Sequence, residues 1–479
     1  MTVVTLQPTT RQWWLLYAAA VVSFIPTFGY YLVGEEGILV NSSLEMWQRG
    51  DWLRLWFYGG DARHGVFANW LIIPMAGALG WEYAPGITRA IMVGATAIGG
   101  LMTAGLAYRL YQDKVLAAMA AVLCVTFADV LLYRGWLGYR DPLLGMLVFG
   151  AIASLWMAVH SGRVAWLIGT LVFSTCAFLT KGIIAYVFVG AAVLVFLVQR
   201  DSRQLLLKPL PLVLAKLTLC LPYLWFHWMI DDQAQGGRMA SEISDKLVPL
   251  GLGAYVWKLV AYPLETMVRT APVSLLVPWW LWRNRNRSVN QNHPAASAWL
   301  TDRSVVTALV IAGLAFLPFW LAPQSHFRYV LPVLPLLGLA FAVCAARQSE
   351  PSRRVLWRWL WLAVGAKFMI TTVLFPYYQH RVRGENYVLT ARQVLQRTAG
   401  FPLYSHDVSA AGLSVTAYMN IQRLPKPVLT FAPAQWDNAF VVSNVADDKL
   451  GTVVARYPLG ANVLYLHCRG TACDTPAPR

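Results

Sequence analysis

Residues 164–199 read "VAWLIGTLVFSTCAFLTKGIIAYVFVGAAVLVFLVQ" and contain two apolar runs, 164–180 and 183–199. Lys181 and Gly182 separate the two runs. Apolar runs that approach 20 residues are typical of helices that cross a membrane. The stretch therefore predicts two consecutive membrane-spanning helices that meet at a lysine.

Comparable runs recur through most of the first 375 residues, and we expect about eleven to thirteen spanning helices. The clearest runs lie at 13–33, 86–108, 115–133, 142–159, 164–180, 183–199, 210–229, 259–282, 304–322, 329–346 and 356–375. The first is too long for the apolar region of a signal peptide, so we expect it to be retained. The shorter run 67–81 contains Pro74, which favours an interfacial or re-entrant helix.

The composition agrees with a polytopic membrane protein. The chain is 57% hydrophobic and only 13% charged, whereas soluble proteins are about 25% charged. Its formal net charge is +16. In a membrane protein such an excess is typical of cytoplasmic loops, and no nucleic-acid-binding motif is present, so we expect no nucleic-acid partner.

Lysine and arginine are denser in one set of alternating loops than in the other. The denser set includes the short loops 200–208 and 347–358. Because cytoplasmic loops carry the excess of Lys and Arg, this pattern predicts a cytoplasmic N-terminus. An odd number of spans then places the C-terminal segment on the outer face.

The chain changes character after its last long apolar run. Residues 377–479 contain short β-rich stretches interrupted by Gly and Pro, which predict a small α/β domain outside the membrane. We therefore expect a transmembrane domain at 1–376 and a soluble domain at 377–479. Cys468 and Cys473 lie close together in the second region, and the sequence leaves open whether they form a disulfide or stay reduced.

Polar residues that are hard to explain by the membrane alone gather at the outer face. They comprise Glu35, Glu36, Asp51, Asp61, His64, Asp141, Lys181, His326 and Arg328. Each has a structural explanation: carboxylates stabilise helix starts, Lys181 can extend toward the interface, and an Arg-Tyr pair can anchor a helix. Together they predict a site that handles an anionic, lipid-linked substrate.

The order of these motifs resembles the GT-C glycosyltransferases. The similar group holds the bacterial protein O-mannosyltransferases and the 4-amino-4-deoxy-L-arabinose transferase of lipid A. The matching elements are Glu35-Glu36, Leu44-Glu45-Met46 and Gly50-Asp51-Trp52 in loop 34–66, Arg140-Asp141, "FLTKG" at 178–182, and "RYVLPVLP" at 328–335. The resemblance covers residues 13–375 and implies an all-α transmembrane fold of the GT-C type, with loop 34–66 as the catalytic outer loop on the periplasmic side of a bacterial inner membrane. Within this loop, Val40, Leu44 and Trp47 are spaced as on one face of a helix, so we expect an interfacial helix that lies flat on the bilayer surface.

The resemblance also implies an activity. A sugar moves, with expected inversion, from a polyprenyl phosphate such as undecaprenyl phosphate to an outer-face acceptor, which is lipid A, an envelope glycan or a protein. No nucleotide-binding domain is apparent, as expected if the sugar arrives on a lipid. The chain departs from the family where Glu35 replaces an aspartate and where "ARHGVFANW", residues 62–70, replaces a Lys-Pro-Pro element.

The resemblance assigns roles to the candidate residues. Glu35 and Asp141 are the expected catalytic carboxylates, and they are also the ligands of a divalent cation if one is used. The expected substrate-binding residues are Glu36, Arg63, His64, Tyr139, Arg140, Lys181, His326, Arg328 and Tyr329. Arg63 or His64 would take the place of the family's lysine at the lipid phosphate.

Two other classes of protein fit part of the pattern. A transporter or flippase would also be polytopic, but we would expect its charges near mid-membrane in broken helices. A polysaccharide polymerase or non-catalytic assembly protein would share the helical plan and tolerate the loss of the carboxylates.

Overall fold

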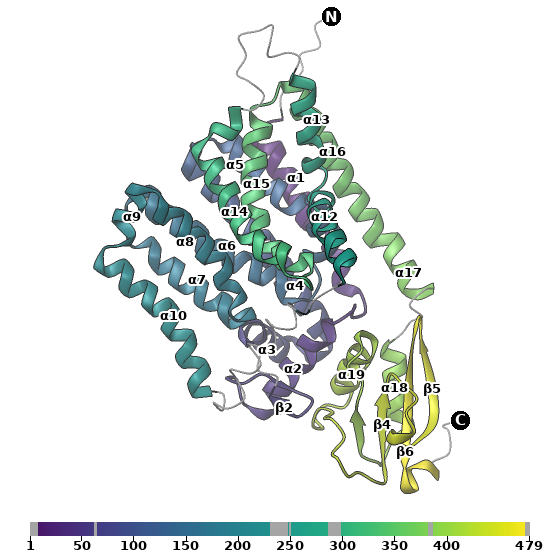
Figure 1. Cartoon of the computed structure of the whole chain (residues 1–479). Helices are drawn as coiled ribbons and strands as arrows, with labels where there is room; N and C mark the ends of the chain where they lie inside the picture. Colours follow the sequence, from purple (N-terminus) through teal and green to yellow (C-terminus); the bar gives the residue numbers. More distant parts are fainter. Residues whose placement is uncertain are drawn as a thin grey trace, which may run out of the picture. The chain divides into compact units, whose positions relative to one another are not determined.

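The computed structural model describes residues 8–61, 65–229, 248, 251–285, 298–381 and 387–474 (Figure 1). The chain folds into two compact units. The first comprises Met1–Ile25, Met92–Trp136 and Arg140–Phe368, and the second comprises Pro26–Ile91, Leu137–Tyr139 and Met369–Arg479. Each unit therefore combines segments that are far apart in the sequence.

The first unit is helical. Its elements are α1 (Thr10–Val22), most of α4 (Ala84–Tyr111), α5 (Lys114–Thr126), the π-helix η3 (Val130–Arg134), α6 (Arg140–Ser161), α7 (Trp166–Lys181), α8 (Ile184–Val198), α9 (Arg200–Leu206), α10 (Pro209–Met229), α12 (Leu252–Arg269), α13 (Val273–Arg285), η5 (Ala298–Thr301), α14 (Arg303–Leu321), η6 (Phe327–Val333), α15 (Leu334–Ala346) and α16 (Glu350–Met369). Within this unit, α6 packs against α7 and α8, and α15 packs against α5 and α14.

Several helices have the length and composition that a membrane requires. In the described part of the chain, five are long and apolar enough to cross it: Trp81–Tyr111, Arg140–Ser161, Arg303–Leu321, Phe327–Ala346 and Glu350–Gln379. A sixth crossing is possible if α8 and α9, bent by 116° at their junction, count as one span. Four further apolar helices are shorter. The protein is thus polytopic, and the total of eleven to thirteen spans stays a prediction.

Local sequence signals explain where the helices begin and end. Asp113 caps α5 by accepting hydrogen bonds from the amides of Val115 and Leu116, as short polar side chains do at helix starts. Gly182 ends α7 with a φ of +68°, and its amide donates to the carbonyl of Phe178 at 2.7 Å. Because left-handed φ values suit glycine, the Lys-Gly pair fixes Lys181 at the last turn of α7.

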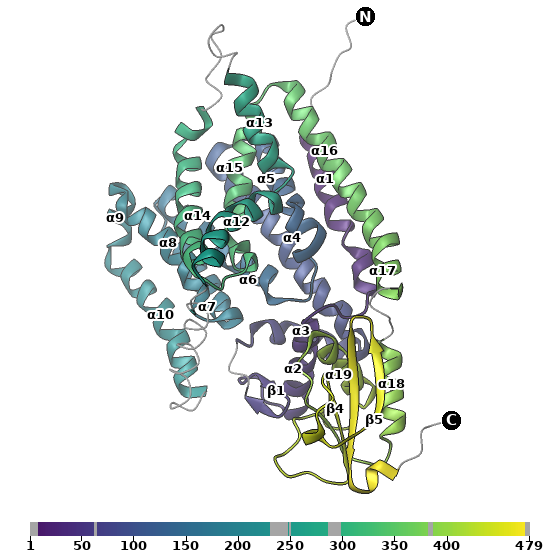
Figure 2. The same cartoon turned by 45° about the vertical axis from the view of Figure 1, so that its right-hand side comes forward.

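The second unit mixes helices with two small sheets. Its elements are η1 (Ile25–Gly29), α2 (Glu36–Arg49), β1 (Trp56–Phe57), β2 (Gly60–Asp61), α3 (Phe67–Leu79), η2 (Trp81–Tyr83), the start of α4, the π-helix η7 (Ile370–Leu374), α17 (Phe375–Arg381), α18 (Tyr387–Arg397), β3 (Leu403–Ser405), α19 (Ala410–Gln422), β4 (Ala439–Ser443), η8 (Asp448–Leu450), β5 (Thr452–Leu459), β6 (Asn462–Arg469) and η9 (Gly470–Asp474). Figure 2 shows this unit with the long strands of its larger sheet in front.

The larger sheet has the strand order β3-β4-β6-β5. β3 pairs with β4 in parallel, whereas β4–β6 and β6–β5 pair antiparallel. All five residues of β4 are buried, which fits a central strand covered on both faces. The α/β character expected for the C-terminal region is therefore present, while the domain boundary at residue 377 stays a prediction.

A disulfide closes the C-terminal end of this sheet. Cys468 of β6 is bonded to Cys473 of η9. The sequence left this pairing open, and the structure contains it. Such a bond is typical of an oxidising compartment.

Helix α2 is buried inside the second unit. Its apolar residues Val40 and Leu44 are 0% exposed, while Trp47 remains 41% exposed. A Cβ added at Gly37 would meet the backbone of Leu413 at 2.5 Å, so α2 and α19 approach each other closely. We expected α2 to lie flat on the bilayer, but its apolar side is covered by protein.

Candidate functional site

In the first unit, the carboxylate of Asp141 pairs with the ammonium of Lys181. Asp141 lies in the first turn of α6 and is buried, and Lys181 ends α7 and is partly exposed. These two residues are 40 positions apart in the sequence. The packing of α6 beside α7 joins their ends and brings together a carboxylate and a cation that the sequence only placed at the same face.

The ring of Tyr329 adds a third member to this cluster. Lys181 Nζ lies 4.8 Å from its centroid, and Arg328 Cζ lies 5.4 Å from it. Tyr329 is buried and stacks on Phe319 of α14, with centroids 5.8 Å apart. A rigid aromatic face thus holds two cations near one carboxylate, which is favourable because the ring face is electronegative.

Arg140 and His326 border the same elements. Nε and Nη2 of Arg140 are buried and make no hydrogen bond with the residues that the structure describes. His326 is exposed and precedes η6, where its carbonyl accepts a hydrogen bond from Tyr262 at 3.3 Å. Arg140 therefore has N–H groups beside Asp141 that a substrate could bind. His326 accepts a hydrogen bond through its backbone carbonyl.

A second charged cluster was missed in the sequence. Asp129 is 3% exposed and pairs with Arg134 at 3.4 Å and with Arg269. The guanidinium carbons of Arg134 and Arg269 lie 5.8 Å and 5.0 Å from the ring centroid of Phe327. Since Phe327 adjoins Arg328, η6 contacts both clusters. Arg269 lies within the run 259–282, for which we expect one apolar span. No sequence signal therefore marks Arg269 as a candidate site residue.

In the second unit, Glu35 directly precedes α2 and is exposed. Its amide donates a hydrogen bond to the hydroxyl of Tyr139 at 3.0 Å. Gly34, before it, has a φ of +60°, which favours glycine. This hydrogen bond and the turn at Gly34 thus fix the backbone around the exposed Glu35.

Glu36 is fully buried and forms a two-bond ion pair with Arg89 of α4. Arg89 Nε lies 2.9 Å from Glu36 Oε1, and Arg89 Nη2 lies 2.5 Å from Oε2. Glu36 also accepts hydrogen bonds from the amides of Val33 and Gly138, each at 2.6 Å. The adjacent glutamates therefore differ in role. Glu36 stabilises the loop before α2 from inside the protein, whereas Glu35 is exposed on that loop.

Arg89 ties the preceding loop to the same pair. It donates to the carbonyls of Thr27 and Tyr30 at 2.8 Å and to that of Tyr31 at 2.7 Å. The guanidinium thus binds a carboxylate and three carbonyls, which uses the fixed fork of donors that arginine offers.

The remaining loop motifs are structural in this unit. Glu45 accepts hydrogen bonds from Arg49 and from the amide of Gly59, each at 3.0 Å, and burial raises the pKa of its carboxyl although Arg49 opposes that shift. Asp51 accepts from Trp56 Nε1 at 2.8 Å. Burial acts to raise the pKa of Asp51, but this bond and two backbone amides outweigh it, so the pKa is lowered.

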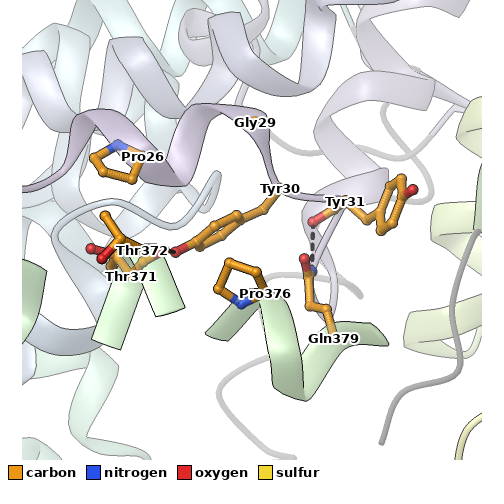
Figure 3. A pocket seen from close by; sticks show the side chains of 8 residues that line it. All are labelled: Pro26, Gly29, Tyr30, Tyr31, Thr371, Thr372, Pro376 and Gln379. Carbon is orange, nitrogen blue, oxygen red and sulfur yellow. Dashed lines mark hydrogen bonds between the residues drawn. The ribbon is translucent and has the colours of Figure 1, made fainter. Parts of the chain in front are cut away.

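Two hollows flank the segment that leads to Glu35. One has a volume of about 460 Å³, and Figure 3 shows Tyr30 and Gln379 in its wall, with Gln379 donating to the carbonyl of Tyr31 at 3.3 Å. The other has a volume of about 770 Å³ and shares Gly29, Tyr30 and Tyr31 with the first. Both volumes fall in the range of small-molecule sites.

Two of the expected substrate-binding residues and the expected metal site have no described geometry. Arg63 and His64 lie outside the described residues. Across the described residues, no group of three or more His, Cys, Asp or Glu side chains could hold a metal ion. Lys181 already neutralises Asp141, and a divalent cation on Glu35 and Asp141 stays a prediction.

Comparison with known proteins identifies the fold. No family model matches the sequence, and no curated protein matches it either. Among solved structures, the chain is similar to ArnT of Cupriavidus metallidurans bound to undecaprenyl phosphate, with a TM-score of 0.69, 18% identity, and coverage of 94% of this chain and 97% of ArnT. The apo form of the same protein gives a TM-score of 0.66 and 17% identity over 98% and 99% of the two chains.

These similarities extend over nearly the whole of both chains. At this level of identity they establish the fold. The expected fold class, an all-α polytopic membrane protein with a small C-terminal α/β part, is therefore confirmed.

Proposed function

We propose that the protein is an integral-membrane glycosyltransferase that moves a sugar from a polyprenyl phosphate to an acceptor at the outer face. The observation that carries this proposal is the Asp141–Lys181 pair beside Tyr329 and Arg328 in a chain with the ArnT fold. That fold has been crystallised in ArnT with undecaprenyl phosphate bound. A lipid phosphate is the kind of group that such a cationic cluster can bind.

The first unit supplies candidates for stabilising the leaving phosphate. When the acceptor attacks the anomeric carbon, the bond to the phosphate oxygen breaks and negative charge develops on the lipid phosphate. Lys181 and Arg328 are cations held by the ring of Tyr329, so they need little reorganisation as charge develops. Asp141 orients Lys181 through their ion pair, and Arg140 offers further donors from the same helix start.

The second unit supplies the candidate base. Glu35 is an exposed carboxylate on a backbone fixed by Tyr139 and by the buried Glu36–Arg89 pair. A carboxylate can take the proton of a hydroxyl acceptor as that acceptor attacks, a general-base role. If the acceptor is a phosphate, it is already a nucleophile, and Glu35 orients it instead.

The loops and the disulfide support the proposed location. We assign the protein to a bacterial inner membrane with its N-terminus in the cytoplasm and its C-terminal residues in the periplasm. Lys and Arg are denser in the loops assigned to the cytoplasm, and the Cys468–Cys473 disulfide supports an oxidising compartment for the other side. The acceptor classes are lipid A, an envelope glycan and a protein.

The proposal is tested by measuring sugar transfer in membranes supplied with polyprenyl-phosphate sugars. We expect Asp141→Asn and Lys181→Met each to lower the rate by about a hundredfold or more, the typical effect of losing a preorganised charge. Asp201→Asn, at an exposed carboxylate of α9, is the matched control and should transfer like wild type.

The second unit is tested in the same assay. Glu35→Gln should lower the rate by about a hundredfold or more when the acceptor is a hydroxyl. Asp448→Asn, at an exposed carboxylate of the same unit, should have no effect. Full transfer by Glu35→Gln and by Asp141→Asn, at wild-type protein levels, would remove both residues from the chemistry.

A further inference from the structure

An apolar cavity lies among α7, α8, α9 and α10 of the first unit. Its volume is about 320 Å³. Figure 1 shows these four helices as neighbours. Of the side chains that line the cavity, only Thr170, Tyr186 and Thr218 carry a polar group. Its walls are otherwise aliphatic, so the cavity suits an aliphatic chain.

The cavity is elongated along α8. It is lined by Tyr186 in the first turn of this helix and by Leu197 near its end. At a rise of 1.5 Å per residue, these two positions are roughly 16 Å apart. At the Tyr186 end, the Tyr186 hydroxyl donates a hydrogen bond to the carbonyl of Thr218 at 2.6 Å, which joins α8 to α10 beside the cavity.

Exposed cations lie close in sequence to the residues that line the other end of the cavity. Leu206 and Leu207 line the cavity at this end. Arg163 lies just before α7, and Arg200, Arg203 and Lys208 lie in or just after α9; all four are exposed. Asp201 is the one carboxylate in segments 161–166 and 199–208. The segments at this end of the cavity thus carry an excess of positive charge. A site for an anionic lipid head group requires such an excess.

A polar group also lies in the wall near this mouth. Thr170 is 9% exposed, lines the cavity, and its hydroxyl has no hydrogen-bond partner among the described residues. It lies in the first turns of α7, close in sequence to Arg163. A buried hydroxyl without a partner costs free energy, and an ester carbonyl just below a lipid head group would accept its proton.

We propose that this cavity binds an anionic, ester-linked phospholipid of the surrounding membrane. One acyl chain fills the slot along α8, the ester carbonyl accepts a hydrogen bond from Thr170, and the head group contacts Arg203 and Lys208. A polyprenyl phosphate has the charge and the apolar chain but no ester carbonyl. The site is separate from the residues assigned to sugar transfer, and it depends only on the protein residing in a membrane.

Native mass spectrometry of the full-length protein, released from mild detergent, tests the proposal. The probes are phosphatidylglycerol, phosphatidylcholine of the same acyl chains, and undecaprenyl phosphate. We expect phosphatidylglycerol to bind and phosphatidylcholine to bind more weakly by about fivefold for each head-group cation engaged. Undecaprenyl phosphate should not displace phosphatidylglycerol.

Gly190 allows the slot to be filled without disturbing its walls. It lines the cavity, and a Cβ added there meets no atom within 4 Å. Gly190→Leu should therefore abolish retention of phosphatidylglycerol. Gly313→Leu is the matched control, because an added Cβ in α14 is equally unobstructed, and it should bind like wild type.

The head group and the ester are tested separately. Arg203→Gln combined with Lys208→Gln should lower phosphatidylglycerol binding by at least about fivefold and leave phosphatidylcholine unchanged. Thr170→Val should lower both lipids equally, because both contain esters. Equal binding by Gly190→Leu and Gly313→Leu, no preference for the anionic lipid, or displacement by undecaprenyl phosphate would each overturn the proposal.

Discussion

Glu36 and Arg89 form a fully buried ion pair in which two nitrogens of the guanidinium meet two oxygens of the carboxylate. The same two side chains bind the backbone at Thr27, Tyr30, Tyr31, Val33 and Gly138. One charge pair therefore fixes the loop that presents Glu35. The first prediction concerns what happens when this pair is broken.

Removing one partner leaves the other charged and buried. Arg89→Met should lower the free energy of unfolding by about 3–5 kcal/mol, because an uncompensated buried charge is costly. Removal of both charges in Glu36→Gln/Arg89→Met should cost less than the sum of the single changes, since the two residues are in direct contact. Thermal unfolding of the purified protein measures both effects.

The control for this prediction is an exposed pair. Glu350 and Arg354 form an ion pair one turn apart at the start of α16, and both are partly exposed. Glu350→Gln should therefore cost no more than about 1 kcal/mol. Additive effects of the two changes at Glu36 and Arg89 would show that they do not act as a pair.

The hydroxyl of Tyr139 provides a milder test of how Glu35 is positioned. Tyr139→Phe removes the acceptor for the Glu35 amide and should lower the transfer rate while leaving thermal stability within about 1 kcal/mol of wild type. In a Glu35→Gln background the same change should have little further effect. Equal losses in the two backgrounds would mean that Tyr139 acts independently of Glu35.

The ring of Tyr329 should matter more than its hydroxyl. Tyr329→Phe keeps the face that Lys181 and Arg328 contact and should retain most of the transfer activity. Tyr329→Leu removes that face, and because such contacts are worth about 0.5–2 kcal/mol, the rate should fall by about twofold to thirtyfold. Equal activity of the two variants would exclude a role for the ring in holding the cations.

Asp407 predicts a pH dependence of stability in the second unit. Burial raises the pKa of its carboxyl above the usual 3.8, and hydrogen bonds from Ser409 oppose this only in part. In the folded protein the group therefore keeps its proton to higher pH than in the unfolded chain. Its contribution to stability is full below pH 3.8 and is lost as the pH rises through the folded pKa.

Asp407→Asn removes this titration while keeping an acceptor for Ser409. Thermal unfolding of wild type and variant should be compared between pH 4 and 8. The stability of wild type relative to the variant should fall as the pH rises. A difference that is constant across this range would contradict the shift at Asp407.

The Cys468–Cys473 disulfide predicts a thiol count. Without reductant, alkylation of the unfolded protein should modify the four cysteines at 124, 176, 220 and 344 and spare the bonded pair. Replacing both bonded cysteines by serine should cost about 2 kcal/mol or less, since the loop between them is short. Six modified cysteines in protein from intact cells would contradict the outer location of this segment.

The sequence predicted the fold class because two signals agreed. Apolar runs such as those around Lys181 indicated spanning helices, and short motifs such as "FLTKG" matched a family with that fold. The sequence placed Lys181 and Asp141 at helix ends on one face, and the packing of α6 against α7 brings them into contact. The positive φ of Gly182 explains why a glycine follows the lysine in "FLTKG". Gly182 ends α7 and leaves Lys181 in the last turn of the helix.

Other features depend on tertiary packing that no local pattern records. Glu35 and Glu36 read as equivalent neighbours, and only the approach of α4 separates them into an exposed and a buried carboxylate. Arg269 lay in an apolar run, yet it pairs with Asp129, 140 residues away. The amphipathic pattern of α2 suggested a membrane surface, and the same pattern serves equally to pack a helix against protein.

The central claim is that the protein transfers a sugar from a polyprenyl phosphate to an outer-face acceptor. The most direct measurement is mass spectrometry of lipid A, envelope glycans and envelope proteins from cells with the gene, without it, and with Asp141→Asn in its place. We predict a sugar-sized mass increment with the wild-type gene and its loss in the other two strains. Identical profiles in all three strains, with the protein present in the membrane, would contradict the claim.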